Sequence, residues 1–404
     1  MFNLAIFYGL IGLGSLCLGI FAYDQLYGST LKHPEEGLGV GRSWKDAGEI
    51  GETDDSLATL SEIQQVIDLQ RRIIHDQMID YQYPNGRYNI SASKLEDLVI
   101  ERNGNPIRSV VVSTWRSGST FFGDIFTASP GLFYHFEPLV DFGINKIRGP
   151  PLASQALKNL KALFSCDYSS LDRYLERVKN RTYIFRANPP LWAQCQAHPS
   201  ICYNHKFLSE MCKLFPFQLM KILRPTLHIA QELLADEKLG VRLVFLTRDP
   251  RGVFQSRKHR SFCQEGLDCS DPSLLCKDMV SDYNTAVELQ KKYPSTFRVL
   301  RYEDLSLEPH KEVKKLIEFY GLDFHPNIKK YIDTHTKYDF GDPYTTFRDS
   351  KIAPFHWRTE LEFEEVEEIQ RNCFVPMKHW GYVPALNISH QREFNPVTNY
   401  MPHL

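Results

Sequence analysis

The 404-residue sequence lacks an excess of either charge. Its 47 Lys and Arg residues are balanced by 49 Asp and Glu residues, for a net charge of −2. A chain without a basic surplus gives no reason to expect a nucleic-acid partner, so any anion site must be local. Hydrophobic residues make up 43% of the chain, which is enough to bury a large core in one or two domains.

Charged side chains are absent from the first stretch, Phe2 to Tyr23. About 20 apolar residues suffice to cross a bilayer, so residues 4–23 are predicted to be a transmembrane anchor after a short cytoplasmic end at 1–3. A cleaved signal peptide is the alternative, but it usually has a positive n-region and a shorter apolar core. Flanking charge does not set the orientation, because the first basic residue is Lys32.

Cysteine pairs with zinc-ligand spacing are also missing. All nine cysteines except Cys17 lie beyond the predicted anchor, and no C-x-x-C pair occurs among them. This pattern favours disulfides of a secretory lumen over a structural metal, with the connectivity left open. The three glycosylation sequons, at Asn89, Asn180 and Asn387, lie on the same side of the anchor and support a luminal location.

Residues 24–105 are predicted to form a luminal stem. Its first part, residues 24–56, is rich in Gly and acidic residues and poor in large apolar ones, which is typical of a flexible segment. A helix is predicted within residues 57–80, because apolar residues recur there at a helical period. The register breaks at Gln70 and Gln77, so a coiled-coil homodimer is left open.

From residue 106 onward, apolar runs alternate with helical patterns. This alternation predicts an α/β fold with a mainly parallel sheet flanked by helices, over residues 106–386, followed by a polar tail at 387–404. In such folds, ligands bind beyond the C-terminal ends of the strands. The predicted strands are Arg108–Ser113, Thr182–Arg186, Phe217–Leu223, Arg242–Thr247 and Phe297–Arg301, and the predicted helices include Asp278–Lys291 and Pro309–Tyr320.

The loop after the first strand reads Trp115-Arg116-Ser117-Gly118-Ser119-Thr120-Phe121. It has one Gly and no following Lys, so it is not the G-x-x-x-x-G-K-[ST] loop of nucleotide triphosphatases. A strand, a small-residue turn and a helix start still make an anion cradle, in which backbone N–H groups and hydroxyls face a phosphate. The alternative is a strand-turn-helix without a ligand.

A second strand, Arg242–Thr247, ends in Arg248-Asp249-Pro250-Arg251. Pro250 suits the first turn of a helix. Ser256, a little under two turns along, is expected to face the same way as Arg248 and to help it bind a second phosphate. The alternative is that Asp249 caps the helix while Arg248 forms an ordinary salt bridge.

Two anion sites at the ends of parallel strands suit a ligand with phosphates at both its 5′ and 3′ ends. A triphosphate fits less well, because no second acidic metal-binding motif of the kinase kind is evident. These two motifs resemble those of the Golgi carbohydrate sulfotransferases, and within that group the galactose, N-acetylglucosamine and N-acetylgalactosamine 6-O-sulfotransferases. The resemblance covers roughly residues 106–386 and includes the stretches Phe133–Leu139, Leu300–Leu305, Arg348–Lys351, His356–Arg358 and His379–Tyr382.

The resemblance implies a P-loop-like fold, the donor 3′-phosphoadenosine 5′-phosphosulfate (PAPS), no required metal, and a glycan or glycosaminoglycan acceptor sulfated at a 6-hydroxyl. It also implies a single-pass type II protein of the Golgi membrane with a luminal catalytic domain. The implied donor-binding residues are Arg116, Ser117, Gly118, Ser119, Thr120 and Phe121 at the 5′ side, Arg248 and Ser256 at the 3′-phosphate, and Arg348 and Ser350 in a C-terminal loop.

Arg116 and Glu137 are the predicted catalytic residues. Arg116 is expected to neutralise charge on the bridging oxygen as the bond to sulfur breaks. Glu137, in Phe-Glu-Pro, is the predicted base for the acceptor hydroxyl, with a pKa raised by its apolar neighbours; it also matches the family's proposed catalytic acid residue. Alternatively, Glu137 orients Arg116 or caps a turn, and His135 is the second candidate for the base. Lys221 and Arg224 either support a donor or acceptor sulfate or form a solvated strand end.

Two other functions compete with this interpretation. A catalytically silent glycan-binding homologue would be suggested by the loss of Arg116, Arg248 or Glu137, and all three are present. A nucleotide-dependent kinase is disfavoured by the missing second Gly and Lys of its phosphate loop. The acceptor-binding residues cannot be identified from the sequence. Residues Tyr302, Glu303 and Asp304 are assigned to packing and helix capping.

Overall fold

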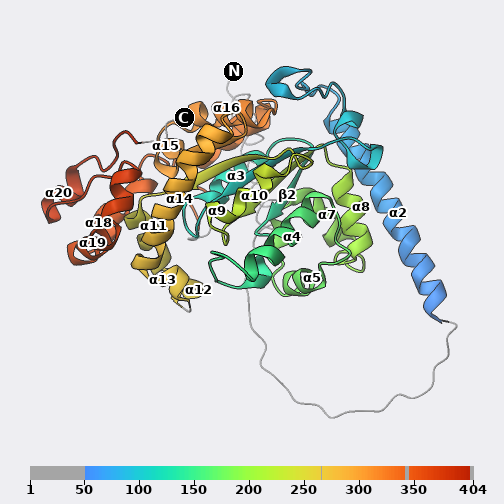
Figure 1. Cartoon of the computed structure of the whole chain (residues 1–404). Helices are drawn as coiled ribbons and strands as arrows, with labels where there is room; N and C mark the ends of the chain where they lie inside the picture. Colours follow the sequence, from blue (N-terminus) through green and yellow to red (C-terminus); the bar gives the residue numbers. More distant parts are fainter. Residues whose placement is uncertain (1–50, 265, 342–344, 401–404) are drawn as a thin grey trace, which may run out of the picture. The chain divides into compact units, whose positions relative to one another are not determined.

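The computed structural model describes residues 51–264, 266–341 and 345–400 (Figure 1). The predicted anchor at 4–23 and most of the predicted flexible segment lie outside the described residues. Within the described ranges, no helix is both long enough and apolar enough to span a membrane. The chain divides into two units, Met1–Asp54 and Asp55–Leu404, and the fold of the second is given below.

A single sheet of five parallel strands forms the centre of this unit. The strands are β1 (Ile107–Val112), β2 (Leu132–Phe136), β3 (Phe217–Ile222), β4 (Arg242–Thr247) and β5 (Phe297–Arg301), in the order β2-β3-β1-β4-β5. Only Arg298 of these strand residues is not buried. Continuous burial is expected when helices cover both faces of a parallel sheet, so the predicted α/β class is confirmed.

The strand order determines where a ligand can bind. From β1 the chain crosses to β2 at one edge of the sheet, whereas from β4 it continues to β5 at the other edge. The carboxyl ends of β1 and β4, which are hydrogen-bonded neighbours, therefore lie where the connections diverge. Open α/β sheets bind ligands in the crevice at such a switch point.

Four of the five predicted strands are confirmed, with ends shifted by at most one residue. The fifth, Thr182–Arg186, is wrong: Tyr183–Arg186 forms the short helix α6, and the fifth strand is β2. Tyr, Ile and Phe favour strands, but Ile184 and Phe185 are both buried while their neighbours Tyr183 and Arg186 are exposed. Burial of two consecutive residues does not alternate as a half-buried strand would, so packing overrides the local preference.

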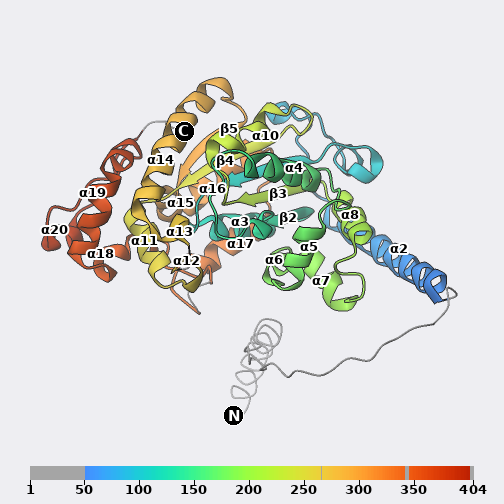
Figure 2. The ribbon, with the colours of Figure 1, turned by 60° about the horizontal axis from the view of Figure 1, so that its bottom comes forward.

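The helices have the following bounds: α2 (Gly51–Gln77), α3 (Ser119–Thr127), α4 (Leu152–Phe164), α5 (Asp172–Lys179), α7 (Pro189–Ala197), α8 (His205–Lys213), α9 (Leu227–Ala230), α10 (Glu232–Ala235), α11 (Pro250–Lys258), α12 (Ser261–Gln264), α13 (Leu267–Ser270), α14 (Pro272–Lys292), α15 (Tyr302–Leu307), α16 (Pro309–Tyr320), α17 (Pro326–His335), α18 (Trp357–Glu360), α19 (Phe363–His379) and α20 (Ile388–Glu393). Short 3-10 helices occupy η1 (Arg87–Asn89), η2 (Leu95–Asp97), η3 (Ile100–Arg102), η4 (Val140–Phe142) and η5 (Ala353–Phe355). Helix α14 packs against α19, and both views place them together (Figures 1 and 2).

The helix predicted in the stem is present as α2, and it packs into the hydrophobic core of the sheet. Ile63, Val66, Ile67 and Ile74 of this helix are buried in the same hydrophobic cluster as the strands. The buried Gln70, at which the apolar period breaks, accepts a hydrogen bond from Gln194 at 3.0 Å. The apolar face of α2 is therefore used for packing within this chain.

All eight cysteines beyond the predicted anchor are paired, as the sequence predicted. The disulfides are Cys166–Cys212, Cys195–Cys202, Cys263–Cys269 and Cys276–Cys373. The last pair joins α14 to α19, which lie far apart in the sequence.

Candidate active site

The loop after β1 forms a cradle at the start of α3. Gly118, with a φ of 86°, is the N-cap residue of this helix. A Cβ atom on Gly118 would lie 2.1 Å from the ring of Tyr302, so glycine alone lets the loop pass over that ring. The hydroxyl of Ser117 is buried and has no hydrogen-bond partner among the described residues. A buried, unpaired hydroxyl beside a helix N-terminus is suited to an anion.

Arg248 follows β4 and reaches this loop. Its Nη1 donates a hydrogen bond to the Arg116 carbonyl at 2.9 Å, and its guanidinium lies 4.6 Å from the centre of the Tyr302 ring. Its Nε is buried and finds no hydrogen-bond partner in the described ranges. The alternative that Arg248 makes an ordinary salt bridge is wrong, because its partners among the described residues are backbone carbonyls and an aromatic ring. The remaining donor is available for an anionic ligand.

The two loops are joined through α11. Asp249 caps this helix by accepting a hydrogen bond from the Arg251 amide at 2.9 Å, and Pro250 occupies the first turn, as predicted. Ser256 lies on the same side as Arg248: its hydroxyl accepts a hydrogen bond from Arg116 Nε at 2.9 Å. Arg116 therefore contacts both residues predicted to bind the 3′-phosphate.

Glu137 directly follows β2 and lies between two cations. Lys221 belongs to β3, and Arg224 follows the end of that strand. Its carboxylate oxygens are 3.3 Å from Lys221 Nζ and 3.5 Å from Arg224 Nη1. Burial raises the pKa of Glu137, but the two cations outweigh burial and bring the pKa below its ordinary value. The predicted raised pKa is therefore wrong. The alternative that Lys221 and Arg224 form a solvated strand end is wrong as well, because each is only 1% exposed.

Lys221 links this ion pair to the loop after β1. Its ammonium donates a hydrogen bond to the Thr120 hydroxyl at 3.1 Å and lies 3.6 Å from the centre of the Phe136 ring. Burial lowers the pKa of Lys221, while the charges of Glu137 and Asp124 oppose that shift. In the sheet, Lys221 is paired with Val111 on one side and with Phe136 on the other. The site thus combines the ends of three strands.

Two further residues at the site were missing from the predictions. Asp124 lies one helical turn after Thr120 on α3; burial raises its pKa to about 7, against the charge of Lys221 and a hydrogen bond with Thr346. Arg257 is buried behind the loop, where its Nε donates to the Trp115 carbonyl at 3.1 Å and its Nη2 to the Thr114 hydroxyl at 3.0 Å. The four-residue spacing of Thr120 and Asp124 places both on one face of α3 and could have identified Asp124 from the sequence. Nothing in the sequence around Arg257 indicates its contacts with the loop.

His135 is a packing residue. Burial lowers its pKa to about 3, and its ring lies 5.0 Å from that of Phe133 and 6.0 Å from that of Phe164. This imidazole is neutral, only 3% exposed and packed between aromatic rings, and its Nε2 is unpaired among the described residues. Its burial and packing therefore favour Glu137 over His135 as the base.

The remaining predicted donor-binding residues differ in their surroundings. Ser119 is buried at the first position of α3, and the Phe121 side chain packs against the hydrophobic core. Arg348 lies 3.7 Å from Asp339 and donates to its neighbour's carbonyl, and the Ser350 amide donates to the Thr336 carbonyl. The segment that carries these two residues reaches the site at Ala353, whose carbonyl accepts from Arg248 at 3.5 Å.

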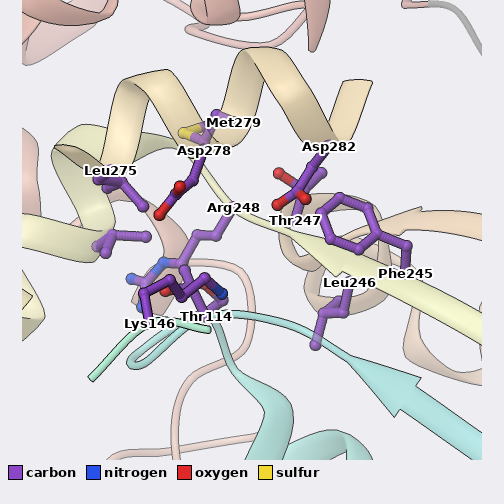
Figure 3. A pocket seen from close by; sticks show the side chains of 12 residues that line it. Thr114, Lys146, Phe245, Leu246, Thr247, Arg248, Leu275, Asp278, Met279 and Asp282 are labelled. Atoms are coloured by element: carbon purple, nitrogen blue, oxygen red, sulfur yellow. The ribbon is translucent and has the colours of Figure 1, made fainter. Parts of the chain in front are cut away.

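A small pocket lies beside the loop, lined by Thr114, Ser117 and Arg248 and, on the side of α14, by Asp278 and Asp282 (Figure 3). Asp282 accepts a hydrogen bond from the Leu227 amide at 2.8 Å, and burial raises its pKa to about 6. Lys146, also in the lining, donates to two backbone carbonyls. Asp282 and Lys146 are therefore hydrogen-bonded to the backbone and support the loops. No cluster of three or more potential metal ligands occurs within the described ranges.

Glu303 holds the loop after β4 by a hydrogen bond to its backbone. This carboxyl group is fully buried; it accepts hydrogen bonds from the Asp249 amide and from the Tyr382 hydroxyl, each at 3.0 Å. Burial, together with the charge of Asp249, raises the pKa of Glu303 to about 7. Glu303 thus connects the turn at Arg248 to the C-terminal part of the domain.

Residues 106–381 match the family model of the sulfotransferase domain. Carbohydrate sulfotransferase 5 of Homo sapiens is 27% identical over 332 residues, covering 71% of this chain and 80% of that protein. Carbohydrate sulfotransferase 4 of Mus musculus is 26% identical over 324 residues (70% and 84%), and carbohydrate sulfotransferase 1 of Mus musculus 25% over 349 residues (71% and 84%). Among solved structures, the sulfotransferase domain from the curacin biosynthetic pathway covers 66% of this chain and 96% of its own at 15% identity, with a TM-score of 0.37.

Proposed function

Because the chain belongs to the sulfotransferase domain family and is a sulfotransferase, we propose that it transfers a sulfuryl group from PAPS to the 6-hydroxyl of a Gal, GlcNAc or GalNAc residue in a glycan. The observation that carries this proposal is the joining of two anion cradles. Arg116 contacts Ser256 and Arg248, so groups suited to a 5′-phosphosulfate and to a 3′-phosphate form one site.

The residues present fit such a donor. Two buried polar atoms, Ser117 Oγ and Arg248 Nε, have no partner among the described residues and would be satisfied by anionic oxygens. Residues 116–121 would hold the 5′ side, and Arg248 with Ser256 the 3′-phosphate. Arg348 and Ser350 are proposed to close over the donor from the segment that reaches Arg248 at Ala353. PAPS supplies the activated sulfuryl group when bound.

Positioning and charge stabilisation are the protein's contributions to this reaction. Transfer forms a bond between the acceptor oxygen and sulfur and breaks the bond from sulfur to the 5′-phosphate oxygen. Glu137 takes the proton of the acceptor hydroxyl, and its low pKa means that it is already ionised at neutral pH. Arg116 and Lys221 neutralise the charge that develops on the departing phosphate. The Glu137 ion pair also aims Lys221 at Thr120 in the phosphate loop.

A sugar acceptor is supported by the relatives, which are carbohydrate sulfotransferases at 25–27% identity. The 6-position rests on the resemblance of the motifs. We also propose a type II orientation in the Golgi membrane. Its support is the apolar segment at 4–23, the eight paired cysteines and the exposure of Asn89, Asn180 and Asn387, since disulfides persist in oxidising compartments.

The test is transfer of radiolabelled sulfate from PAPS by the full-length protein in detergent. The acceptors are chondroitin, desulfated keratan and GlcNAc-terminated oligosaccharides, and label at C6 of one of them is the expected result. Binding of adenosine 3′,5′-bisphosphate without transfer to any acceptor would indicate a silent glycan-binding homologue. Failure to bind this nucleotide as well would reject the proposed donor site.

A further inference from the structure

The wall of the site beside Glu137 is built by η4 and α5. The Glu137 carbonyl accepts a hydrogen bond from Val140, the first residue of η4, and α5 packs against η4. Arg173 of α5 donates to the Asp141 carbonyl at 3.1 Å, and its guanidinium lies 5.9 Å from the centre of the Phe142 ring. Helix α5 is therefore attached to the segment that immediately follows Glu137.

Three arginines recur every four residues along this wall: Arg173, Arg177 and Arg181, here called the basic strip. Residues four apart lie on one face of a helix, and the turn continues past the end of α5 because the Arg181 amide donates to the Val178 carbonyl. Arg173 and Arg177 are exposed and Arg181 is partly exposed. Residues 172–181 hold four basic and two acidic side chains, in a chain whose net charge is −2.

The charge of the strip extends to the reaction centre. Arg173 Nε lies 3.8 Å from the Asp141 carboxylate. Burial raises the pKa of Asp141, and the positive charges of Arg173, Arg224 and Arg177 oppose that shift. Arg224 is also the partner of Glu137. A polyanion lying along the strip would thus be attracted toward the residues that flank the proposed base.

Tyr183 lies between the strip and Glu137. Although aromatic, it is 43% exposed, and its ring meets the Phe136 ring edge to face at 6.3 Å. Burial and the charge of Glu137 raise the pKa of Tyr183, while Arg181, which also hydrogen-bonds to it, opposes this shift. An exposed ring next to the residue before Glu137 offers the apolar face of a sugar a surface to pack on. Figure 2 shows the short helix that carries Tyr183 beside α7 and near α5.

We propose that the acceptor is an anionic glycan, held by the basic strip through its carboxylate or sulfate groups and by Tyr183 through the sugar next to the reacting one. This inference rests on the proposed function and names its substrate class. Guanidinium groups pair with carboxylate and sulfate oxygens in bidentate geometry, which lysines on flexible stems do not match. A neutral chain offers these arginines only hydroxyl groups, which do not form the charge-assisted, bidentate pairs that carboxylate and sulfate groups form.

The test compares the full-length wild-type enzyme with the triple variant Arg173→Gln, Arg177→Gln, Arg181→Gln; the last change leaves the Asn180 sequon intact. Expected is a rise of roughly tenfold in KM for chondroitin with kcat almost unchanged, because exposed arginines contribute to binding and not to the chemical step. KM for PAPS and for a neutral GlcNAc-terminated oligosaccharide stays the same. KM for chondroitin rises with salt in the wild type and much less in the variant.

The matched control removes three exposed positive charges elsewhere, by Lys292→Gln on α14 and Arg371→Gln with Lys378→Gln on α19. It retains wild-type KM for chondroitin. Tyr183→Ala is expected to lower kcat/KM for chondroitin and Tyr183→Phe to restore it, since the ring and not the hydroxyl makes the contact.

Three outcomes would overturn the inference. Equal KM values for chondroitin in the triple variant and the wild type would remove the strip from the acceptor site. Preference of the wild type for the neutral oligosaccharide would show that the acceptor is not anionic. No transfer to chondroitin with intact adenosine 3′,5′-bisphosphate binding would reject the acceptor class alone, whereas loss of that binding too would reject the proposed function with it.

Discussion

At the scale of single residues, the proposed chemistry depends on how Glu137 is held. Its carboxylate lies between two almost fully buried cations, at 3.3 Å and 3.5 Å, and is only 15% exposed itself. This arrangement gives a carboxylate that is ionised before the acceptor arrives and fixed in direction. It also makes Glu137 responsible for the position of Lys221, so loss of its charge affects both proton transfer and the phosphate loop.

Replacing Glu137 by Gln is predicted to lower kcat by about 10² to 10⁴, which is the usual contribution of a positioned base. Binding of adenosine 3′,5′-bisphosphate, measured by calorimetry, is expected to weaken far less than kcat falls, because the change at the loop is confined to the ion pair that aims Lys221 at Thr120. Glu176→Gln, an exposed carboxylate of α5, is the control and keeps wild-type turnover. Near-normal turnover in Glu137→Gln would show that another group takes the proton.

The raised pKa of Glu303 predicts how the free energy of unfolding depends on pH. Its pKa is about 7 in the folded protein, against an ordinary value of 4.5. Between these values the folded state binds more protons than the unfolded one, so stability falls as the pH rises through this window. The loss amounts to roughly 3 kcal/mol.

In Glu303→Gln this contribution disappears. The free energy of unfolding, measured by chemical denaturation at pH 5 and pH 8, should therefore decline less in the variant than in the wild type. Parallel pH dependence of the two proteins would contradict the assignment. The other buried carboxyls, such as Asp124, are the same in both proteins and cancel in the comparison.

At the scale of elements, the strand-loop-helix unit of β1 and α3 depends on one glycine. Gly118→Ala is predicted to weaken adenosine 3′,5′-bisphosphate binding at least about 100-fold, because the left-handed φ of 86° disfavours a side chain and the Cβ would overlap the Tyr302 ring. Displacing that ring would also move Arg248, which stacks on it. The binding constant is measured by calorimetry.

Gly149→Ala is the matched control for this substitution. A Cβ at Gly149 meets no atom within 4 Å. Its nucleotide affinity and thermal midpoint should equal those of the wild type. If Gly118→Ala bound the nucleotide as tightly as Gly149→Ala, the loop would not be the phosphate cradle.

At the scale of the whole molecule, disulfides connect parts of the domain that lie far apart in the sequence. Cys276–Cys373 closes a separation of 97 residues and Cys195–Cys202 one of 7. In the chain-entropy account, a disulfide that closes a longer loop stabilises the folded protein more, because it removes more entropy from the unfolded chain. The variant Cys276→Ala, Cys373→Ala should therefore lose roughly 2 kcal/mol more stability than the variant Cys195→Ala, Cys202→Ala. The denaturation midpoints of the two double variants provide the measurement, and equal losses would contradict it.

The sequence by itself determined the α/β class, four of the five strands and the positions of both loops that are proposed to bind the phosphates. These features are encoded locally: a run of buried residues ends in a turn of Gly and hydroxyl residues, or in Asp249-Pro250 at a helix start. It also predicted that the loops of Arg116 and Arg248 would meet, since parallel strands share one carboxyl edge. The stem helix was predicted as well, but its packing into the core was not.

Only the tertiary structure decided the properties that depend on neighbours distant in the sequence. The pKa of Glu137 is low because β3 brings Lys221 and Arg224 beside it, whereas its adjacent residues Phe136 and Pro138 suggested the opposite. Likewise, Tyr183–Arg186 is a helix because of how it packs, and the basic strip adjoins the site because α5 rests on η4. Burial and charge act through space, and the sheet order sets which residues are close.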